Sequence, residues 1–392
     1  MPVSAKIAEG MQSSSWIRRM FEAGEELRSR LGPENVFDLS LGNPIDEPPE
    51  EFIRELRRQV QNPRPGMHRY MSNAGYLATR EAVALSVSQE LCLKFYGNDI
   101  VMTSGAAAGL NIVFKTLLEP GDEVIVISPY FAEYLSYIDN NGGVARIVET
   151  GEDFLPVPDA IRNATNSNTR AIIINSPNNP TGVVYDKNFL QALSEALEQS
   201  SRVLGRTLYL ISDEPYRRLV YDNLQFYSPI NFYAQSILVS SFSKDLSLPG
   251  ERIGYVAVNP AIEDKTELVA GFTYANRILG FVNAPALMQN VITNLQNVTV
   301  DIDKYQARRD YLYKGLLEAG YDVIKPQGAF YAFPAVPGGD DVTFVRSLME
   351  QGVLGVPGSG FGKKGYMRLS FCVDDYTLEG AVKGLKKAVR RA

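Results

Sequence analysis

Short runs of consecutive apolar residues alternate along the chain with segments whose apolar residues recur at helical spacing. Continuous runs such as AIII and EVIVI are typical of strands buried on both faces. We expect strands at residues 123–127, 144–148, 171–174, 208–211, 237–239 and 255–258. Helices are expected between several of them, above all over 104–118 and 187–202. This alternation predicts an α/β fold, with a mostly parallel sheet between two layers of helices over roughly residues 50–285.

The two ends of the chain carry a different pattern. Before the sheet we expect a helix over 13–30 and a short strand over 36–41. After it we expect a long helical stretch over 286–319, short strands near 330–334, 353–356 and 366–371, and a final helix over 375–391. The pattern predicts two domains: a large α/β domain over 46–285, and a smaller α+β domain formed by 1–45 and 286–392 together.

Composition narrows the class of protein. The 392 residues are 45% hydrophobic and 21% charged, as in globular proteins, and the net charge of -6 argues against a nucleic-acid partner. Two cysteines and one histidine (His68) argue against a disulfide framework, a metal site and serine–histidine catalysis. No run approaches the roughly 18 apolar residues of a membrane span, and no secretory signal is visible. We therefore expect a cytoplasmic protein without a membrane partner.

Lys244 is the first candidate for chemistry. It follows the expected strand 237–239, at the edge where open α/β sheets bind ligands. Ser241 and Ser243 lie beside it, and Arg252 follows in the same segment. Two hydroxyls and a guanidinium can hold a phosphate dianion by charge-assisted hydrogen bonds. A reactive lysine beside a phosphate anchor suggests pyridoxal 5'-phosphate held as a Schiff base.

Such a cofactor needs further partners. A carboxylate must face its pyridine nitrogen; Asp213, at the end of an expected strand, is the natural candidate, although Glu214 competes with it and Asp213 could instead cap a helix. Asn179 and Tyr216 could donate to the ring's 3'-oxygen, although the loop SPNNPTG around Asn179 could also be an ordinary turn. Phe131 could cover the ring face or simply belong to the core.

A helix start offers a second contact for the phosphate. The expected helix over 104–118 opens with Ser104, Gly105 and Ala106. Free backbone N–H groups and the positive end of the helix dipole attract anions there. Gly105 would let the backbone approach a phosphate closely.

The segment from Ser241 to Gly254, SFSKDLSLPGERIG, resembles throughout the cofactor-lysine signature of class I/II pyridoxal-phosphate aminotransferases. The resemblance extends to TSGAAAGL, SPNNPTG, ISDEPY and MRLSF, which occur in the family's order and approximate spacing. The chain is thus similar to this family over most of its length. The resemblance implies fold type I of the pyridoxal-phosphate-dependent transferases, as in aspartate aminotransferase, and pyridoxal 5'-phosphate as the cofactor.

The resemblance also implies a role for each matching residue. Lys244 would carry the cofactor as a Schiff base and move a proton between the substrate Cα and the cofactor. Asp213 would pair with the pyridine nitrogen, and Asn179 and Tyr216 would bond the 3'-oxygen. Backbone or side-chain groups of six residues would surround the phosphate: Ser104, Gly105, Ala106, Ser241, Ser243 and Arg252.

Other matches concern the substrate and a second subunit. Arg368 would grip the substrate α-carboxylate, with Asn179 and the backbone of Gly42 beside it. Tyr70, in HRYMSNAGY, matches a tyrosine that reaches the phosphate of the neighbouring subunit, which implies a homodimer. One departure is the turn 106–108, which reads AAA where many relatives place a hydroxyl or amide; this predicts weaker cofactor binding.

Transamination between an L-amino acid and a 2-oxo acid is the activity that the resemblance implies. Other pyridoxal-phosphate reactions use the same cofactor residues: β-elimination at a C–S bond, decarboxylation and ring-forming synthase chemistry. A non-catalytic ligand-sensing domain is a further alternative, although no DNA-binding module is visible. A nicotinamide dehydrogenase is disfavoured because no G-x-G-x-x-G opens a first βαβ unit.

The side chain of the substrate is left open by the sequence. Arg277 could receive a second carboxylate and favour aspartate or glutamate, or it could be a surface residue. Four aromatic residues would suit an aromatic or aliphatic side chain equally well: Tyr130, Tyr134, Phe330 and Tyr331.

Overall fold

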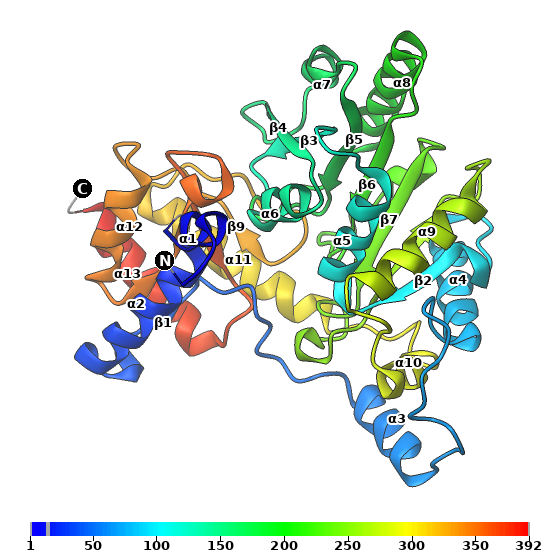
Figure 1. Ribbon diagram of the computed structural model, residues 1–392. Coiled ribbons are helices and arrows are strands. Elements are labelled where there is room, and N and C mark those ends of the chain that lie inside the picture. Colours follow the sequence, from blue (N-terminus) through cyan, green and yellow to red (C-terminus); the bar gives the residue numbers. More distant parts are fainter. Residues whose placement is uncertain (1, 13–15, 391–392) are drawn as a thin grey trace.

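A seven-stranded sheet is the centre of the molecule (Figure 1). The computed structural model describes residues 2–12 and 16–390. The strands lie in the order β2-β8-β7-β6-β5-β3-β4, and only β8 runs antiparallel to its neighbours. Their bounds are β2 Ile100–Thr103, β3 Glu123–Ser128, β4 Val144–Glu149, β5 Thr169–Asn175, β6 Tyr209–Asp213, β7 Ser236–Ser241 and β8 Gly254–Val258. The predicted mostly parallel sheet is confirmed.

Helices cover both faces of this sheet (Figure 1). They are α4 (Leu77–Leu91), α5 (Gly105–Leu117), α6 (Glu133–Asn140), α7 (Pro158–Ala164), α8 (Lys187–Leu204) and α9 (Lys265–Ile278). In β5, Ile172 belongs to the core that includes Leu193 of α8, whereas Ile173 belongs to the core that includes Ile112 of α5. Successive residues of a strand point to opposite faces, so two covered faces require a continuous apolar run.

Two small sheets lie beside the large one and bring the start of the chain to its C-terminal third. The first pairs β1 (Phe37–Asp38) with β10 (Val353–Leu354) in parallel. The second has the order β11-β12-β9 and is antiparallel; its strands are β11 Val356–Pro357, β12 Met367–Ser370 and β9 Tyr331–Ala332. The surrounding helices are α2 Trp16–Leu31, α11 Ile302–Ala319, α12 Asp341–Met349 and α13 Asp375–Val389. We call these strands and helices the small-sheet group; the exact domain boundaries stay a prediction.

The remaining α-helices are α1 (Ala5–Gln12), α3 (Glu50–Gln61) and α10 (Ala286–Ile292). In Figure 1, α3 and α10 form a projection at one end of the large sheet. No helix among the described residues is long and apolar enough to cross a membrane.

The expectations for the ends of the chain need correction in detail. The long helix expected over 286–319 is two helices, because α10 ends at Ile292 and α11 begins only after Asp301, whose carboxylate caps it by accepting a bond from the N–H of Lys304 at 3.1 Å. The strand expected over 36–41 is reduced to two residues. The expected helix over 13–30 begins at Trp16 within the described part of the chain, and residues 13–15 lie outside it. Strand β2 was not expected.

Candidate active site

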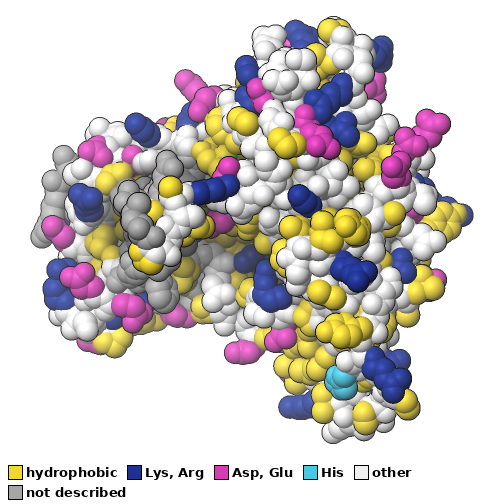
Figure 2. Space-filling model, viewed as in Figure 1, with side chains coloured by type: hydrophobic (Ala, Val, Ile, Leu, Met, Phe, Trp, Pro, Cys, Tyr) yellow, Lys and Arg dark blue, Asp and Glu magenta, His cyan; other side chains and the backbone are white. Residues whose placement is uncertain are grey.

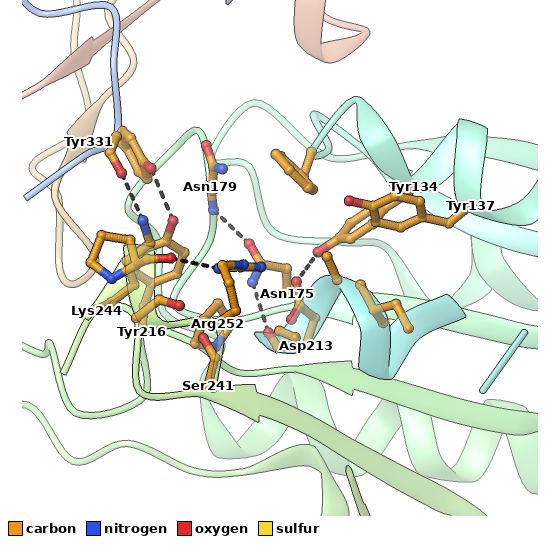
Figure 3. Close-up of a pocket in the computed structure, with 18 of the residues that line it drawn as sticks. Tyr134, Tyr137, Asn175, Asn179, Asp213, Tyr216, Ser241, Lys244, Arg252 and Tyr331 are labelled. Carbon is orange, nitrogen blue, oxygen red and sulfur yellow. Dashed lines mark hydrogen bonds between the residues drawn. The ribbon is translucent and has the colours of Figure 1, made fainter. Parts of the chain in front are cut away.

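A cavity of about 260 Å³ lies where β5, β6 and β7 end. Parallel strands carry their last residues to one edge of the sheet, and Asn175, Asp213 and Ser241 are the last residues of these three strands. The small-sheet group closes the other side with Tyr331 and Arg368. Nineteen residues line the cavity, and Figure 3 shows most of them: Gly42, Ala106, Ala107, Leu110, Phe131, Tyr134, Tyr137, Asn175, Asn179, Asp213, Pro215, Tyr216, Ser241, Ser243, Lys244, Pro249, Arg252, Tyr331 and Arg368.

The amine of Lys244 is held at the cavity wall. Its Nζ donates a hydrogen bond to the backbone oxygen of Gly42 at 2.7 Å and lies 5.4 Å from the centre of the Phe330 ring. Burial lowers the pKa of Lys244 to about 8, and the positive charges of Arg368 and Arg252 act in the same direction, against the opposing influence of Cys372. A neutral amine is a nucleophile and a base, so Lys244 is suited to both tasks near neutral pH.

Asp213 lines the same cavity and has one unpaired carboxylate oxygen. The hydroxyl of Tyr134 donates to Oδ2, whereas Oδ1 is buried and has no hydrogen-bond partner among the described residues. Burial raises the pKa of Asp213 to about 7, although the bond from Tyr134 opposes the shift. A buried oxygen without a donor is costly, and a protonated pyridine nitrogen would supply that donor. The residues present therefore fit the ring of pyridoxal 5'-phosphate.

Glu214, the competing carboxylate, is engaged elsewhere. Its Oε1 accepts hydrogen bonds from Ser212 at 2.7 Å and Ser228 at 2.5 Å, and it is not among the residues that line the cavity. The geometry thus favours Asp213 over Glu214 as the partner of a ring nitrogen.

Arg368 also lines the cavity, and its guanidinium has no carboxylate partner among the described residues. Arg368 is only 2% exposed; its Nη2 donates to the backbone oxygen of Ser40 at 2.6 Å and its Nη1 to Oδ1 of Asn179 at 3.1 Å. The rings of Tyr331 and Phe361 cover it at 4.6 and 4.7 Å. Its Nε has no hydrogen-bond partner within the described chain. A buried cation of this kind is suited to bind a carboxylate.

The remaining polar groups connect the two sides of the cavity. Oδ1 of Asn175 accepts a hydrogen bond from the backbone N–H of Asn179 at 2.7 Å, and its Nδ2 donates to the backbone oxygen of Asp213 at 2.8 Å. The hydroxyls of Tyr216 and Tyr331 lie 3.0 Å apart. Asn179 and Tyr216 both line the cavity, as do Asp213 and Arg368, and their bonds to a 3'-oxygen stay a prediction.

The opposite end of the cavity is suited to a phosphate. Ser241, Ser243 and Arg252 line it together with the first turn of α5. Gly105 has a φ of +78°, and a Cβ there would lie 2.6 Å from Nη2 of Arg252. Backbone N–H groups at a helix start and a guanidinium make an anion site. Ser104 precedes the turn; neither it nor Gly105 lines the cavity itself.

Several expected residues lie apart from this cavity. Tyr70 is 91% exposed and lies in a separate hollow with His68. Arg277 is exposed near the end of α9 and does not line the cavity, and neither do Tyr130 and Phe330.

Phe131 and Tyr134 take different roles in the same wall. Phe131 lines the cavity, with its ring edge-on to that of Tyr134 at 5.5 Å. Tyr134 points its hydroxyl at Asp213, so it does not simply offer an aromatic surface to a substrate. Asn175 and Tyr137 also line the cavity and were missed. The only sequence signal for Asn175 is its position directly after the apolar run AIII.

Comparison with known proteins gives the family. The family model described as "Aminotransferase class I and II" matches residues 34–385. The chain belongs to this family. Members depend on pyridoxal phosphate, and the predicted transferase class is confirmed. This aminotransferase is 31% identical over 365 residues to the probable aspartate aminotransferase of Methanocaldococcus jannaschii, covering 91% of this chain and 94% of that protein. It is 32% identical over 362 residues to the aspartate/prephenate aminotransferase of Thermus thermophilus, covering 90% and 91%.

Solved structures agree with the predicted fold. An aminotransferase from Eubacterium rectale has a TM-score of 0.96 at 38% identity and covers 100% of this chain and 99% of its own. The aspartate aminotransferase from Thermus thermophilus with maleate has a TM-score of 0.86 at 29% identity, covering 97% and 98%. These similarities confirm fold type I for this aminotransferase.

Proposed function

We propose that this aminotransferase binds pyridoxal 5'-phosphate on Lys244 and moves an amino group between an L-amino acid and a 2-oxo acid. One observation carries the proposal: a single cavity holds a lysine with a lowered pKa, a carboxylate with a free oxygen and a guanidinium that has no carboxylate partner in the described part of the chain. These are the amine, the ring partner and the substrate clamp that transamination needs.

The cofactor, when bound, supplies a protonated ring that accepts the electron pair left when the substrate Cα loses its proton. The protein's residues do the rest. Arg368 binds the α-carboxylate in its buried slot and so fixes the direction of the Cα–H bond. Lys244 takes the proton from Cα, because its pKa of about 8 leaves a useful fraction of neutral amine at neutral pH. Asp213 has a free carboxylate oxygen that would accept a hydrogen bond from the ring nitrogen.

Aspartate is the first amino donor to test, because relatives in the comparison are named for it. The cationic side chains that line the cavity are Lys244, Arg252 and Arg368, each of which already has a task. No further cation of the described residues lines it to receive a side-chain carboxylate. An acidic substrate therefore requires a cation from outside this cavity, and we propose Arg277 of a second copy as the candidate.

The chain also exposes an apolar surface, and we propose that a second copy of the chain covers it. Tyr70 is 91% exposed, and Leu77, Tyr274 and Ile278 expose 52%, 64% and 49% of their surfaces. On the face drawn in Figure 2, hydrophobic side chains gather over α9 and over the projection that carries α3 and α10. We propose a homodimer that buries this surface and brings Tyr70 to the phosphate end of the other copy's cavity.

The deciding experiment uses the purified holoenzyme. Each L-amino acid is incubated with 2-oxoglutarate, and glutamate is measured beside pyruvate, ammonia and carbon dioxide. Glutamate with the matching 2-oxo acid supports the proposal, with aspartate expected among the donors. Pyruvate with ammonia would show β-elimination instead, and carbon dioxide would show decarboxylation. Lys244→Ala is the control: it must lose both the product and the visible absorbance of the bound cofactor.

A further inference from the structure

The closest polar contact of Asp213 comes from another element. Tyr134 lies in the first turn of α6, is 2% exposed and donates its hydroxyl to Oδ2 of Asp213. In Figure 3 this hydroxyl points straight at the carboxylate at the end of β6. The bond joins residues 79 positions apart in the sequence.

The phenol keeps its proton and donates a hydrogen bond to the ionised carboxylate. Burial and the negative charge of Asp213 raise the pKa of Tyr134 well above its ordinary value of 10, so the hydroxyl keeps its proton throughout the working pH range. A donor that cannot ionise stabilises the charged form of its acceptor. The bond from Tyr134 therefore opposes the burial that favours the protonated carboxyl of Asp213.

The other titratable groups near Asp213 do not replace this contact. Glu214 raises the pKa of Asp213. Tyr216 and Tyr137 lie close enough for the charge of Asp213 to raise their own pKa values, but Tyr216 shares its hydroxyl contact with Tyr331. Tyr137, one turn along α6, lines the cavity without a hydrogen bond to Asp213. Among these neighbours, Tyr134 alone favours the ionised carboxylate.

We propose that Tyr134 is a positioning residue: by holding Oδ2 of Asp213, it leaves Oδ1 free for the ring nitrogen of the cofactor and keeps the carboxylate ionised. This rests on the proposed function, because the ring nitrogen belongs to pyridoxal 5'-phosphate. It assigns to Tyr134 a task on the protein side of the cofactor, in place of contact with the substrate side chain. Tyr134→Phe removes the hydroxyl and keeps the ring that packs edge-on against Phe131 at 5.5 Å.

The first test needs no cofactor. The carboxyl band of Asp213 is titrated by infrared difference spectroscopy in the cofactor-free protein and assigned by its loss in Asp213→Asn. Tyr134→Phe should raise the apparent pKa of Asp213, whereas the matched variant Tyr137→Phe should leave it unchanged. An unchanged titration in Tyr134→Phe would overturn the proposal, even if the protein never bound the cofactor. This titration therefore tests the role of Tyr134 independently of whether the protein is an active aminotransferase.

The second test follows the holoenzyme. Loss of a hydrogen bond to a charged group corresponds to a fall of about ten- to a hundredfold in kcat, with little change in KM for the amino donor. In a protein that already carries Asp213→Asn, adding Tyr134→Phe should cause no further fall in kcat. The fall should also vanish when both enzymes carry a cofactor analogue with CH in place of the ring nitrogen. A fall of the same size with the analogue would mean that Tyr134 acts through packing, and the proposal would fail.

Discussion

Lys244 donates its side-chain hydrogen bond to the backbone oxygen of Gly42, at 2.7 Å and across 202 positions of sequence. Gly42 follows β1 of the small-sheet group, whereas Lys244 follows β7 of the large sheet. A Cβ at position 42 would lie 1.9 Å from the hydroxyl oxygen of Tyr331, so only glycine allows this approach. The candidate catalytic amine is therefore held by a contact between the large sheet and the small-sheet group.

Capture of the cofactor by the empty protein should depend on pH through Lys244. Its pKa of about 8 lies below the ordinary 10.5, so the neutral amine, which attacks the aldehyde, forms earlier than on a surface lysine. The capture rate should rise about tenfold per pH unit below this pKa and level off above it. Stopped-flow absorbance measures the rate, and Lys244→Ala reports the background from exposed lysines. If the capture rate reached half of its maximum only near pH 10.5, the lowered pKa of Lys244 would be contradicted.

Arg368→Ala should weaken substrate binding and spare the cofactor. Truncating a buried cation that binds an anion corresponds to about a hundredfold rise in KM for the amino donor, or more. The absorbance of the bound cofactor should stay, because we propose that Arg368 binds the substrate and not the cofactor. Arg170 is a matched control: its guanidinium also stacks on a ring, 4.8 Å from the centre of Tyr209, but outside the cavity. An unchanged KM in Arg368→Ala would show that another group binds the carboxylate.

The large sheet could be predicted because its signal is local. Two covered faces make a strand a continuous apolar run, as in β5, and the polar residue that ends such a run marks the ligand edge. The break between α10 and α11 was missed because residues on both sides have helical spacing, and only the cap at Asp301 marks the new start.

In the candidate site, too, some residues could be predicted from a local pattern, whereas others depend on how distant elements pack. Lys244, Asp213 and Ser241 lie at or just after strand ends, so a parallel sheet gathers them. The direction of the Tyr134 hydroxyl depends instead on how α6 docks beside the end of β6, which no local pattern encodes. Tyr70 does not line the cavity of its own chain, so the site role proposed for it depends on the proposed dimer.

Gly105→Ala should cost stability and cofactor affinity together. The left-handed backbone conformation at this residue costs a non-glycine residue about 1–2 kcal/mol in the free energy of unfolding. The added Cβ would also displace Nη2 of Arg252, which lies 2.6 Å away, and so weaken the phosphate site. We expect the Kd for pyridoxal phosphate to rise at least about tenfold.

Gly121→Ala is the control for that change. Gly121 has a φ of +89°, but an added Cβ there meets nothing within 4 Å. Both variants should lose stability in denaturant titrations, and only Gly105→Ala should lose cofactor affinity by fluorescence titration. Equal Kd values for the two variants would show that the guanidinium does not hold the phosphate.

Mixing two inactive variants tests the shared site. The Lys244→Ala variant lacks the amine and keeps Tyr70. The Tyr70→Ala variant lacks the tyrosine and keeps Lys244. If Tyr70 serves the cavity of the other copy, a mixed dimer contains one complete site and one that lacks both residues. Unfolding the two variants together and refolding them should restore transaminase activity, up to about a quarter of the wild-type value when half of the dimers are mixed. Each variant refolded alone is the control. No gain on mixing, with mixed dimers present by native mass spectrometry, would place Tyr70 outside the shared site.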